Sequence, residues 1–432
     1  MPVFNRNLRR SYPRVVRGDG VWLYDDEGRE YLDGSGGAIV ANIGHGVAEV
    51  AEAVGRQAAE VAYASGAIFT NDPVEQLASE LDEVLPEPLG HSYFLCSGSE
   101  AIEASVKLAR QYHRERGRTD KWKVVSRFPS YHGNTLTALS LSGREHYRAI
   151  YGPLLTEFPR VPAPDSYRRP SGDTWDGAAV VAEIERQGPD TVAAFLAEPI
   201  IGSSLGAMSP HPEYYRRVAE ACRAHDVLFI ADEVMAGMGR TGKWFSFEHF
   251  GVVPDIVVCG KGLSGGYAPL SAMIAANHVV ETIRDGSGAF VHAQTYSHMP
   301  LTAAAGLATV RHLKEHRLVD RVALVDALFF DKLAALSAHP NVGDVRGRGL
   351  LAGVEMVADR ETKRPFARSE KVAERVADAA LSCGLVVWPN TGHLESGDGD
   401  IIMLGPPFTV TTGEMDELVA RFLRALEQAL GR

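Results

Sequence analysis

The stretch DIVVCGKGLSGGYAPL, residues 255–270, decides the fold, because in it a short apolar run ends abruptly at Lys261 between two glycines. The run has the pattern of a buried strand, and the glycines mark a turn, so the lysine is predicted to be reactive rather than solvated. Residues 227–234, VLFIADEV, form a second apolar run that ends on a carboxylate, Asp232. A Schiff-base lysine and an acid for a pyridinium nitrogen are the pair that pyridoxal phosphate chemistry requires.

Composition limits the classes of partner. The chain has 432 residues, 45% of them hydrophobic, which is enough for a large core and more than one domain. Its net charge of −11 argues against a nucleic-acid surface or a polybasic membrane anchor. No apolar stretch approaches the roughly 20 residues of a membrane-spanning helix. We therefore expect a cytoplasmic protein that acts on small molecules.

Two smaller features agree with this expectation. The first seventeen residues hold five arginines but lack the apolar core of a signal peptide, so they are expected to form a solvated arm. The four cysteines are scattered without CxxC spacing, which predicts a reducing compartment, no disulfide and no metal cluster.

From about residue 70 to 330, apolar strands alternate with helical stretches such as residues 100–116 and 212–225. The predicted strands are HSYFLC (91–96), KWKVVSR (121–127), TVAAFLAE (191–198), VLFIAD (227–232), DIVVC (255–259) and SAMIAA (271–276). This alternation predicts an α/β fold with a large, mainly parallel sheet covered by helices. Ligands should then lie at the carboxyl ends of the strands.

The two ends of the chain have a different pattern. Residues 21–34 are predicted to form two strands around a polar turn. Short strands and two helices follow residue 330. We expect residues 1–69 and 331–432 to contribute to one small α+β domain, and residues 70–330 to form the large cofactor-binding domain.

A phosphate site is predicted where the strand of FLCSGSEAIEASVKLAR runs through Ser97, Gly98 and Ser99 into a helix. Free backbone N–H groups and the helix dipole favour an anion at such a junction. A plain capped helix is the alternative, because Ser and Gly are common before helices.

A dinucleotide fingerprint is the main rival interpretation of the turn after residue 259. The residues that match it are Gly260, Gly262, Gly265 and Glu281. Against a nicotinamide oxidoreductase, Gly266 and Pro269 interrupt the helix that the motif should open, and the signature has no lysine between its first glycines. A non-catalytic scaffold with a vestigial site is a further alternative.

Taken together, these stretches resemble the class III aminotransferases, a subgroup of the fold-type I pyridoxal phosphate enzymes. The resemblance covers nearly the whole chain, and the order and spacing of its motifs are specific. The stretches that carry it are YLDGSGG and NIGH near the N-terminus, SGSEAIEASVKLAR, YHGNT, AEPI, ADEVMAGMGRTG, PDIVVCGKGLSGGYAPL, QTYSHMPL, RGRGLLAGVE and GPPFTVT.

The resemblance implies roles for residues around pyridoxal 5'-phosphate. Lys261 would hold the cofactor as a Schiff base and move the substrate proton, and Asp232 would keep the ring nitrogen protonated. The stretch 97–99 would bind the phosphate, through Gly98 and Ser99 above all. Tyr131 would stack on the ring, and Val234 would cover the opposite face.

Further positions follow from the same resemblance. Thr295 would reach the phosphate of the neighbouring subunit, which implies a homodimer with a shared active site and leaves assembly to a tetramer open. Glu198 and Glu233 match acidic positions around the cofactor, although a strand-end salt bridge explains each equally well. His132 is expected to form structural hydrogen bonds. Arg240 either orders the site or contacts substrate.

Departures from the family pattern concern the substrate. Ornithine-type members carry a glutamine where this chain has Met235. Omega-amine members pair a glutamate with an arginine at the positions of Ser203 and Met403, so both halves of that pair are absent. Arg144 and Arg148 are candidates for binding a substrate carboxylate.

The predicted function is a ping-pong aminotransferase that moves an amino group from an omega-amino acid or primary amine to a keto acid or aldehyde. An amino-acid racemase or aminomutase of the same family is the alternative, because the cofactor and lysine support either outcome.

Overall fold

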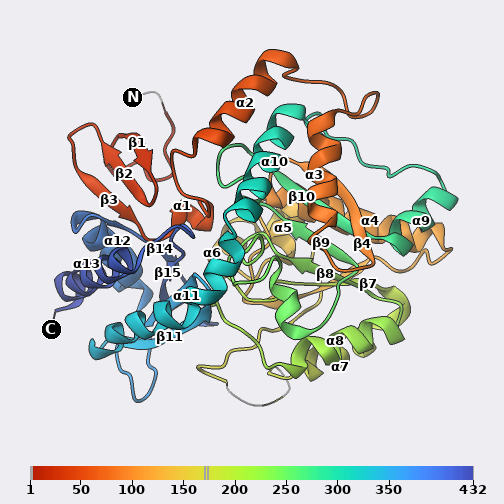
Figure 1. Ribbon diagram of the computed structural model, residues 1–432. Helices are drawn as coiled ribbons and strands as arrows, with labels where there is room; N and C mark the ends of the chain where they lie inside the picture. The colour runs from red at the N-terminus through yellow and green to blue at the C-terminus, as the bar shows by residue number, and fades with distance from the viewer. Residues whose placement is uncertain (1–2, 170–171, 173–174, 432) are drawn as a thin grey trace.

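A seven-stranded sheet forms the centre of the computed structural model, which describes residues 3–169, 172 and 175–431 (Figure 1). Its strand order is β4-β10-β9-β8-β7-β5-β6. The strands are β4 (Leu89–Leu95), β5 (Lys123–Phe128), β6 (Arg160–Pro162), β7 (Val192–Ala197), β8 (Leu228–Asp232), β9 (Ile256–Cys259) and β10 (Ser271–Ala276). Only β10 runs antiparallel to its neighbours, so the prediction of a large, mainly parallel sheet is confirmed.

The strands β7, β8 and β9 are short and almost continuously apolar because helices cover both faces of the sheet. On β8, Leu228 and Ile230 belong to one core cluster, whereas Phe229 and Ala231 belong to the other. The first cluster packs under α4 (Gly98–Glu115), α5 (Leu136–Leu141) and α9 (Asn277–Asp285). The second packs under α3 (Asp72–Asp82), α7 (Ala178–Gln187), α8 (Glu213–Ala224) and α10 (Pro300–Glu315).

Segments from the two ends of the chain lie side by side, with the red N-terminal strands next to the blue C-terminal helices in Figure 1. One sheet has the order β1-β2-β3-β13, in which β13 pairs in parallel with β3; a second has the order β11-β12-β15-β14. The strands are β1 (Val15–Asp19), β2 (Trp22–Asp25), β3 (Glu30–Asp33), β11 (Val342–Arg348), β12 (Leu351–Met356), β13 (Leu385–Val386), β14 (Trp388–Thr391) and β15 (Asp400–Leu404). Helices α12 (Val372–Ser382) and α13 (Thr412–Leu430) pack against each other beside these sheets.

The remaining helices connect these parts. They are α1 (Gly36–Ile39), α2 (Ala48–Glu60), α6 (Glu145–Tyr151) and α11 (Leu318–Leu333). Helix α2 packs against α10. The solvated arm expected over the first seventeen residues ends earlier than predicted, because β1 begins at Val15 and pairs with β2. All four cysteines have free thiols.

Candidate active site

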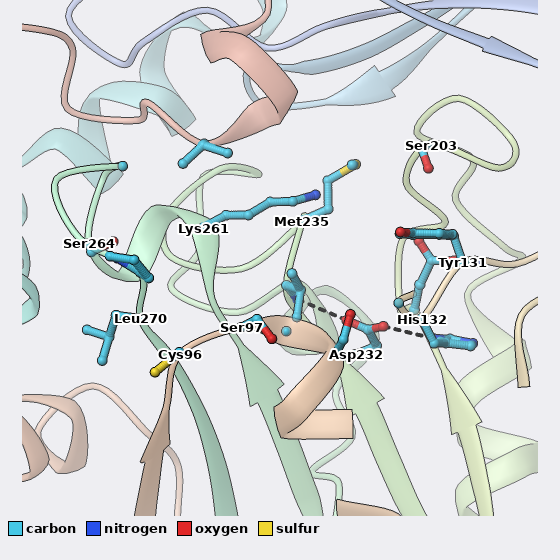
Figure 2. Close-up of a pocket in the computed structure, with 18 of the residues that line it drawn as sticks. Cys96, Ser97, Tyr131, His132, Ser203, Asp232, Met235, Lys261, Ser264 and Leu270 are labelled. Carbon is cyan, nitrogen blue, oxygen red and sulfur yellow. Dashed lines mark hydrogen bonds and ion pairs between the residues drawn. The ribbon is translucent and has the colours of Figure 1, made fainter. Parts of the chain in front are cut away.

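Three strand ends bring the predicted site residues together. Strand β8 ends at Asp232, β9 is followed by Lys261 in the short 3-10 helix η4 (Lys261–Leu263), and β4 leads into the N-terminus of α4. The carboxyl ends of parallel strands meet at one edge of a sheet, and a cavity of about 320 Å³ lies there (Figure 2). The predicted residues that line it are Ser97, Gly98, Ser99, Tyr131, His132, Glu198, Asp232, Val234 and Lys261.

Lys261 extends across this cavity from a strained backbone position, as Figure 2 shows. Its φ of 45° lies in the left-handed region, which is uncommon for a residue with a Cβ and is found where a site constrains the chain. Burial lowers the pKa of the Lys261 amine to about 8, and the charges of Asp232 and Glu198 oppose that shift. The neutral share of this amine near physiological pH is therefore larger than in an ordinary lysine, which favours a role as nucleophile or base.

Asp232 is fixed by two contacts. One carboxylate oxygen, Oδ2, lies 2.8 Å from Nδ1 of His132, and the other accepts a hydrogen bond from the backbone N–H of Val234 at 3.1 Å. The backbone N–H of His132 donates to Oγ of Ser142 at 2.8 Å. The buried Nε2 of His132 has no partner among the described residues. The geometry agrees with a structural hydrogen-bonding role for His132.

The N-terminus of α4 presents hydroxyl and backbone N–H groups to the cavity. Oγ of Ser97 accepts from the N–H of Glu100 at 3.3 Å, so the helix is capped as the alternative interpretation expected. Because the first N–H groups of a helix have no partner within it, those of Gly98 and Ser99 stay available for an anion. A Cβ on Gly98 would come within 3.0 Å of Val234, which explains the glycine at this close approach.

Tyr131 and Glu198 also line the cavity and are linked to each other. The backbone N–H of Tyr131 donates to Oε1 of Glu198 at 3.2 Å, and the N–H of Gly202 donates to Oε2 at 2.8 Å. Burial raises the pKa of Glu198. Glu198 therefore orders the backbone around Tyr131 and does not form a strand-end salt bridge among the described residues.

Glu233 and Arg240 do not line the cavity. Glu233 accepts hydrogen bonds from the hydroxyl and backbone of the segment that begins at Ser246, and burial raises its pKa to about 7. Arg240 donates to the carbonyl oxygens of Leu350 at 3.0 Å and Pro406 at 2.6 Å. Of the two roles expected for Arg240, these contacts favour the ordering one.

Thr295 lies apart from the cavity of its own chain. Its side chain is exposed, and its carbonyl oxygen accepts a hydrogen bond from Oη of Tyr63 at 3.0 Å. The predicted cofactor residues therefore meet at one cavity, apart from Glu233 and Thr295, the second of which the resemblance assigned to the neighbouring subunit.

Several other residues of the cavity wall were not predicted as cofactor contacts, although Ser203 and Met235 had been named as departures that concern the substrate. They are Val40, Cys96, Gly133, Ser203, Met235, Ser264, Gly266, Ala268, Pro269 and Leu270. Five of these belong to the stretch 255–270, so their proximity to Lys261 was available as a signal. The pattern did not show which of them face inward, because a glycine-rich turn has no fixed periodicity.

Comparison with known proteins decides the family. A sequence profile of the family described as aminotransferase class-III matches residues 3–426. The chain belongs to the class III aminotransferases. Among its relatives, this class III aminotransferase is 43% identical over 421 residues to the uncharacterized aminotransferase YodT of Bacillus subtilis strain 168, covering 96% of this chain and 95% of that protein.

Two further relatives of this class III aminotransferase have more specific names. The diaminobutyrate–2-oxoglutarate transaminase of Halomonas elongata is 36% identical over 429 residues, covering 96% of this chain and 90% of that protein. The crystal structure of a thermostable (S)-enantioselective omega-transaminase from Thermomicrobium roseum has a TM-score of 0.91 at 36% identity and covers 98% of this chain and 94% of that one. The fold prediction and the recognition of the family are thus confirmed.

Within the described ranges, this aminotransferase has no helix with the length and apolar character that crossing a membrane requires.

The two arginine candidates for binding a substrate carboxylate differ in their surroundings. Arg148 forms an ion pair with Glu157 at 2.6 Å, whereas Arg144 is buried and donates to Oγ of Ser203 at 2.7 Å. Met403 is buried in β15 and does not line the cavity.

Proposed function

We propose that this protein is a pyridoxal 5'-phosphate-dependent aminotransferase that moves an amino group from an omega-amino acid or primary amine to a keto acid or aldehyde in two half-reactions. The observation that carries the proposal is the convergence of Lys261, Asp232 and the N-terminus of α4 on one cavity. The omega-transaminase and diaminobutyrate transaminase among its relatives support the class of amino donor.

The side chains around the cavity fit the cofactor. The capped helix N-terminus with Gly98 and Ser99 suits a phosphate, and Tyr131 and Val234 offer apolar faces to a ring. The Asp232 carboxylate suits a protonated ring nitrogen. Bound pyridoxal 5'-phosphate would supply an aldehyde that carries the amino group and a ring that accepts electrons from the substrate carbon.

The protein's own residues would hold and move protons. Lys261, whose amine is partly neutral, would attach to the aldehyde and later carry the proton to and from the substrate carbon. Asp232 would keep the ring nitrogen charged, and His132, 2.8 Å from it, would fix the carboxylate in one orientation. Glu198 would hold the backbone of Tyr131 in place for stacking.

We further propose a cytoplasmic homodimer in which Thr295 of each subunit completes the phosphate site of the other. Its exposed side chain, outside the cavity of its own chain, supports this arrangement.

The test is a spectral screen of the cofactor-loaded enzyme. Single amino acids and amines are added without any keto acid, and the visible absorbance of the cofactor is followed. An omega-amino acid or amine should bleach the band, and a keto acid should restore it. The Lys261→Ala variant is the control, and it should lose about 10²- to 10⁴-fold or more in rate, the range for a positioned acid–base group.

Other outcomes of the screen would contradict the proposal. A band that persists while the substrate loses its chirality or moves its amino group would indicate a racemase or aminomutase. Failure of the wild-type protein to retain any cofactor that borohydride can fix onto Lys261 would exclude the whole cofactor assignment.

A further inference from the structure

Arg144 is a buried guanidinium that lacks an acidic partner in the described part of the chain. It is 7% exposed, and its Nη2 donates to Oγ of Ser203 at 2.7 Å and to Oδ1 of Asn390 at 3.2 Å, both neutral groups. Arginine keeps its charge at all ordinary pH values. Because burying an unpaired charge costs free energy, this position calls for an anion.

The groups around Arg144 still have donors to offer. Its own Nε and the Nδ2 of Asn390 are buried without a partner among the described residues. Since arginine only donates, Asn390 must turn its oxygen toward Arg144, which leaves its NH₂ group free. Oγ of Ser203 accepts from Arg144, so the hydroxyl hydrogen of Ser203 is free to donate as well. Three neighbouring side chains thus have unused donors.

These donors lie beside the active-site cavity. Ser203 lines it, and so does Tyr131, whose ring centroid is 5.5 Å from Cζ of Arg144. Figure 2 shows Ser203 and Tyr131 on the side toward which the Lys261 amine points. Arg144 does not line the cavity itself but contacts both of these residues, so its charge can act on the cavity through the Ser203 hydroxyl.

We propose that Arg144, Ser203 and Asn390 form the subsite that binds a carboxylate of the substrate, with Ser203 donating directly and Arg144 supplying the charge. This inference rests on the proposed function, because it concerns the substrate of that same cavity. Omega-amine members have a glutamate and an arginine at the positions of Ser203 and Met403, and this chain lacks both. In the proposed subsite, Arg144 supplies the positive charge that the family's arginine would otherwise provide.

Neighbouring charges favour the same ligand. Arg6 of the N-terminal arm donates to Oη of Tyr147, three residues after Arg144, at 3.0 Å. Burial, followed by the charges of Arg144, Arg368 and Arg6, lowers the pKa of His146. The acid whose charge acts on Arg144 is Glu198, which already accepts hydrogen bonds from two backbone N–H groups. A carboxylate would therefore enter a region of positive potential.

Paired substrates test the subsite. The donor half-reaction is measured with 4-aminobutanoate and with butylamine, and the acceptor half-reaction with pyruvate and with propanal. In Arg144→Met, the ratio of kcat/KM for the carboxylate compound to that for its neutral counterpart should fall about 10- to 100-fold, because the positive charge that strengthens the Ser203 hydrogen bond is lost. Ser203→Ala should show a smaller fall, and Arg144→Lys should recover part of the ratio.

The control is Arg148→Met, which removes a nearby arginine that is already paired with Glu157 and should leave both ratios as in the wild type. A fall confined to one half-reaction identifies whether the donor or the acceptor carries the bound carboxylate. Equal losses for charged and neutral compounds in Arg144→Met and Ser203→Ala would overturn the subsite.

Binding without turnover separates this inference from the proposed function. Calorimetry measures the affinity of the cofactor-loaded protein for pentanoate, a carboxylate without an amine. Weaker binding of pentanoate by Arg144→Met than by Arg148→Met supports the subsite even if no donor is ever found. Equal affinity of both variants would refute the subsite even if the enzyme proves to be an active aminotransferase.

Discussion

Lys261 combines three physical features that a catalytic amine needs. Gly260 and Gly262 flank it without side chains, so the strained φ of 45° can be adopted beside the cavity. The side chain crosses the cavity without an ion-pair partner in the described part of the chain. Burial lowers its pKa to about 8, although Asp232 and Glu198 raise it in part. Strain, position and burial thus act on one residue.

This shifted pKa predicts how the cofactor-free protein captures pyridoxal 5'-phosphate. Only the neutral amine attacks an aldehyde, so the capture rate should rise about tenfold per pH unit up to about pH 8 and then level off. An ordinary lysine would keep rising to about pH 10.4. Stopped-flow absorbance between pH 6 and 10 measures the midpoint. A midpoint near that of an ordinary lysine would contradict the effect of burial.

At the scale of single elements, strand β12 depends on one buried carboxylate. Glu355 is 1% exposed and forms ion pairs with Arg346 of β11 at 2.7 Å and with Arg168 at 2.6 Å. Nε2 of His393, in the segment between β14 and β15, lies 3.3 Å from it. Glu355 therefore joins two strands of the small sheet to a segment that follows β6.

Removing this carboxylate should destabilise the fold strongly. Glu355→Gln leaves Arg346 and Arg168 without their shared partner, and such a loss typically costs about 3–5 kcal/mol. Glu395→Gln is the matched control, because its ion pair with Arg169 is exposed and is worth at most about 1 kcal/mol. Urea unfolding of the cofactor-free proteins measures both. Similar losses in the two variants would contradict the special role of Glu355.

The stability difference between the wild type and Glu355→Gln should also depend on pH. Burial alone would raise the pKa of Glu355, but Arg346, His393 and Arg168 hold it well below its usual range. A lowered carboxyl pKa contributes stability above the unfolded value of about 4.3, and the contribution is lost as the pH falls below it. The stability difference between wild type and Glu355→Gln should therefore shrink as the solution is acidified from pH 5 to pH 3.

At the scale of the whole molecule, the shared active site can be tested by mixing subunits. Lys261→Ala lacks the amine, and Thr295→Glu places a negative charge where a phosphate would bind. If Thr295 acts across the interface, a mixed dimer has one site with both changes and one site with neither. Co-refolding the two inactive variants should then restore activity, up to about one quarter of the wild-type value for random pairing of two kinds of subunit.

Absence of restored activity in verified mixed dimers would place Thr295 in its own subunit's site or remove its role altogether. A monomeric protein in sedimentation analysis would contradict the homodimer directly. The division of the chain at residues 69 and 330 into a small and a large domain stays a prediction.

The amino-acid sequence by itself determined the strands and the site residues that follow from local hydrophobic patterns. Mainly apolar runs of five to eight residues predicted six strands of the large sheet, and the polar residues at the ends of two of them, Asp232 and Lys261, predicted the site. Strand β6 was missed because three residues, one of them proline, give no periodicity. One of the short strands expected after residue 330, LVVW (385–388), divides into β13 and β14, since its two halves pair with different sheets.

Only the tertiary structure decided which side chains meet across long separations. The sequence gives Arg144 and Arg148 equal standing as carboxylate-binding candidates, yet Arg144 is buried against Ser203 and Asn390 while Arg148, in α6, pairs with Glu157. Partners of this kind come from elements that are far apart in the chain, and no local periodicity records them. The burial of a charge, and with it the ligand that the charge requires, is a property of the assembled fold.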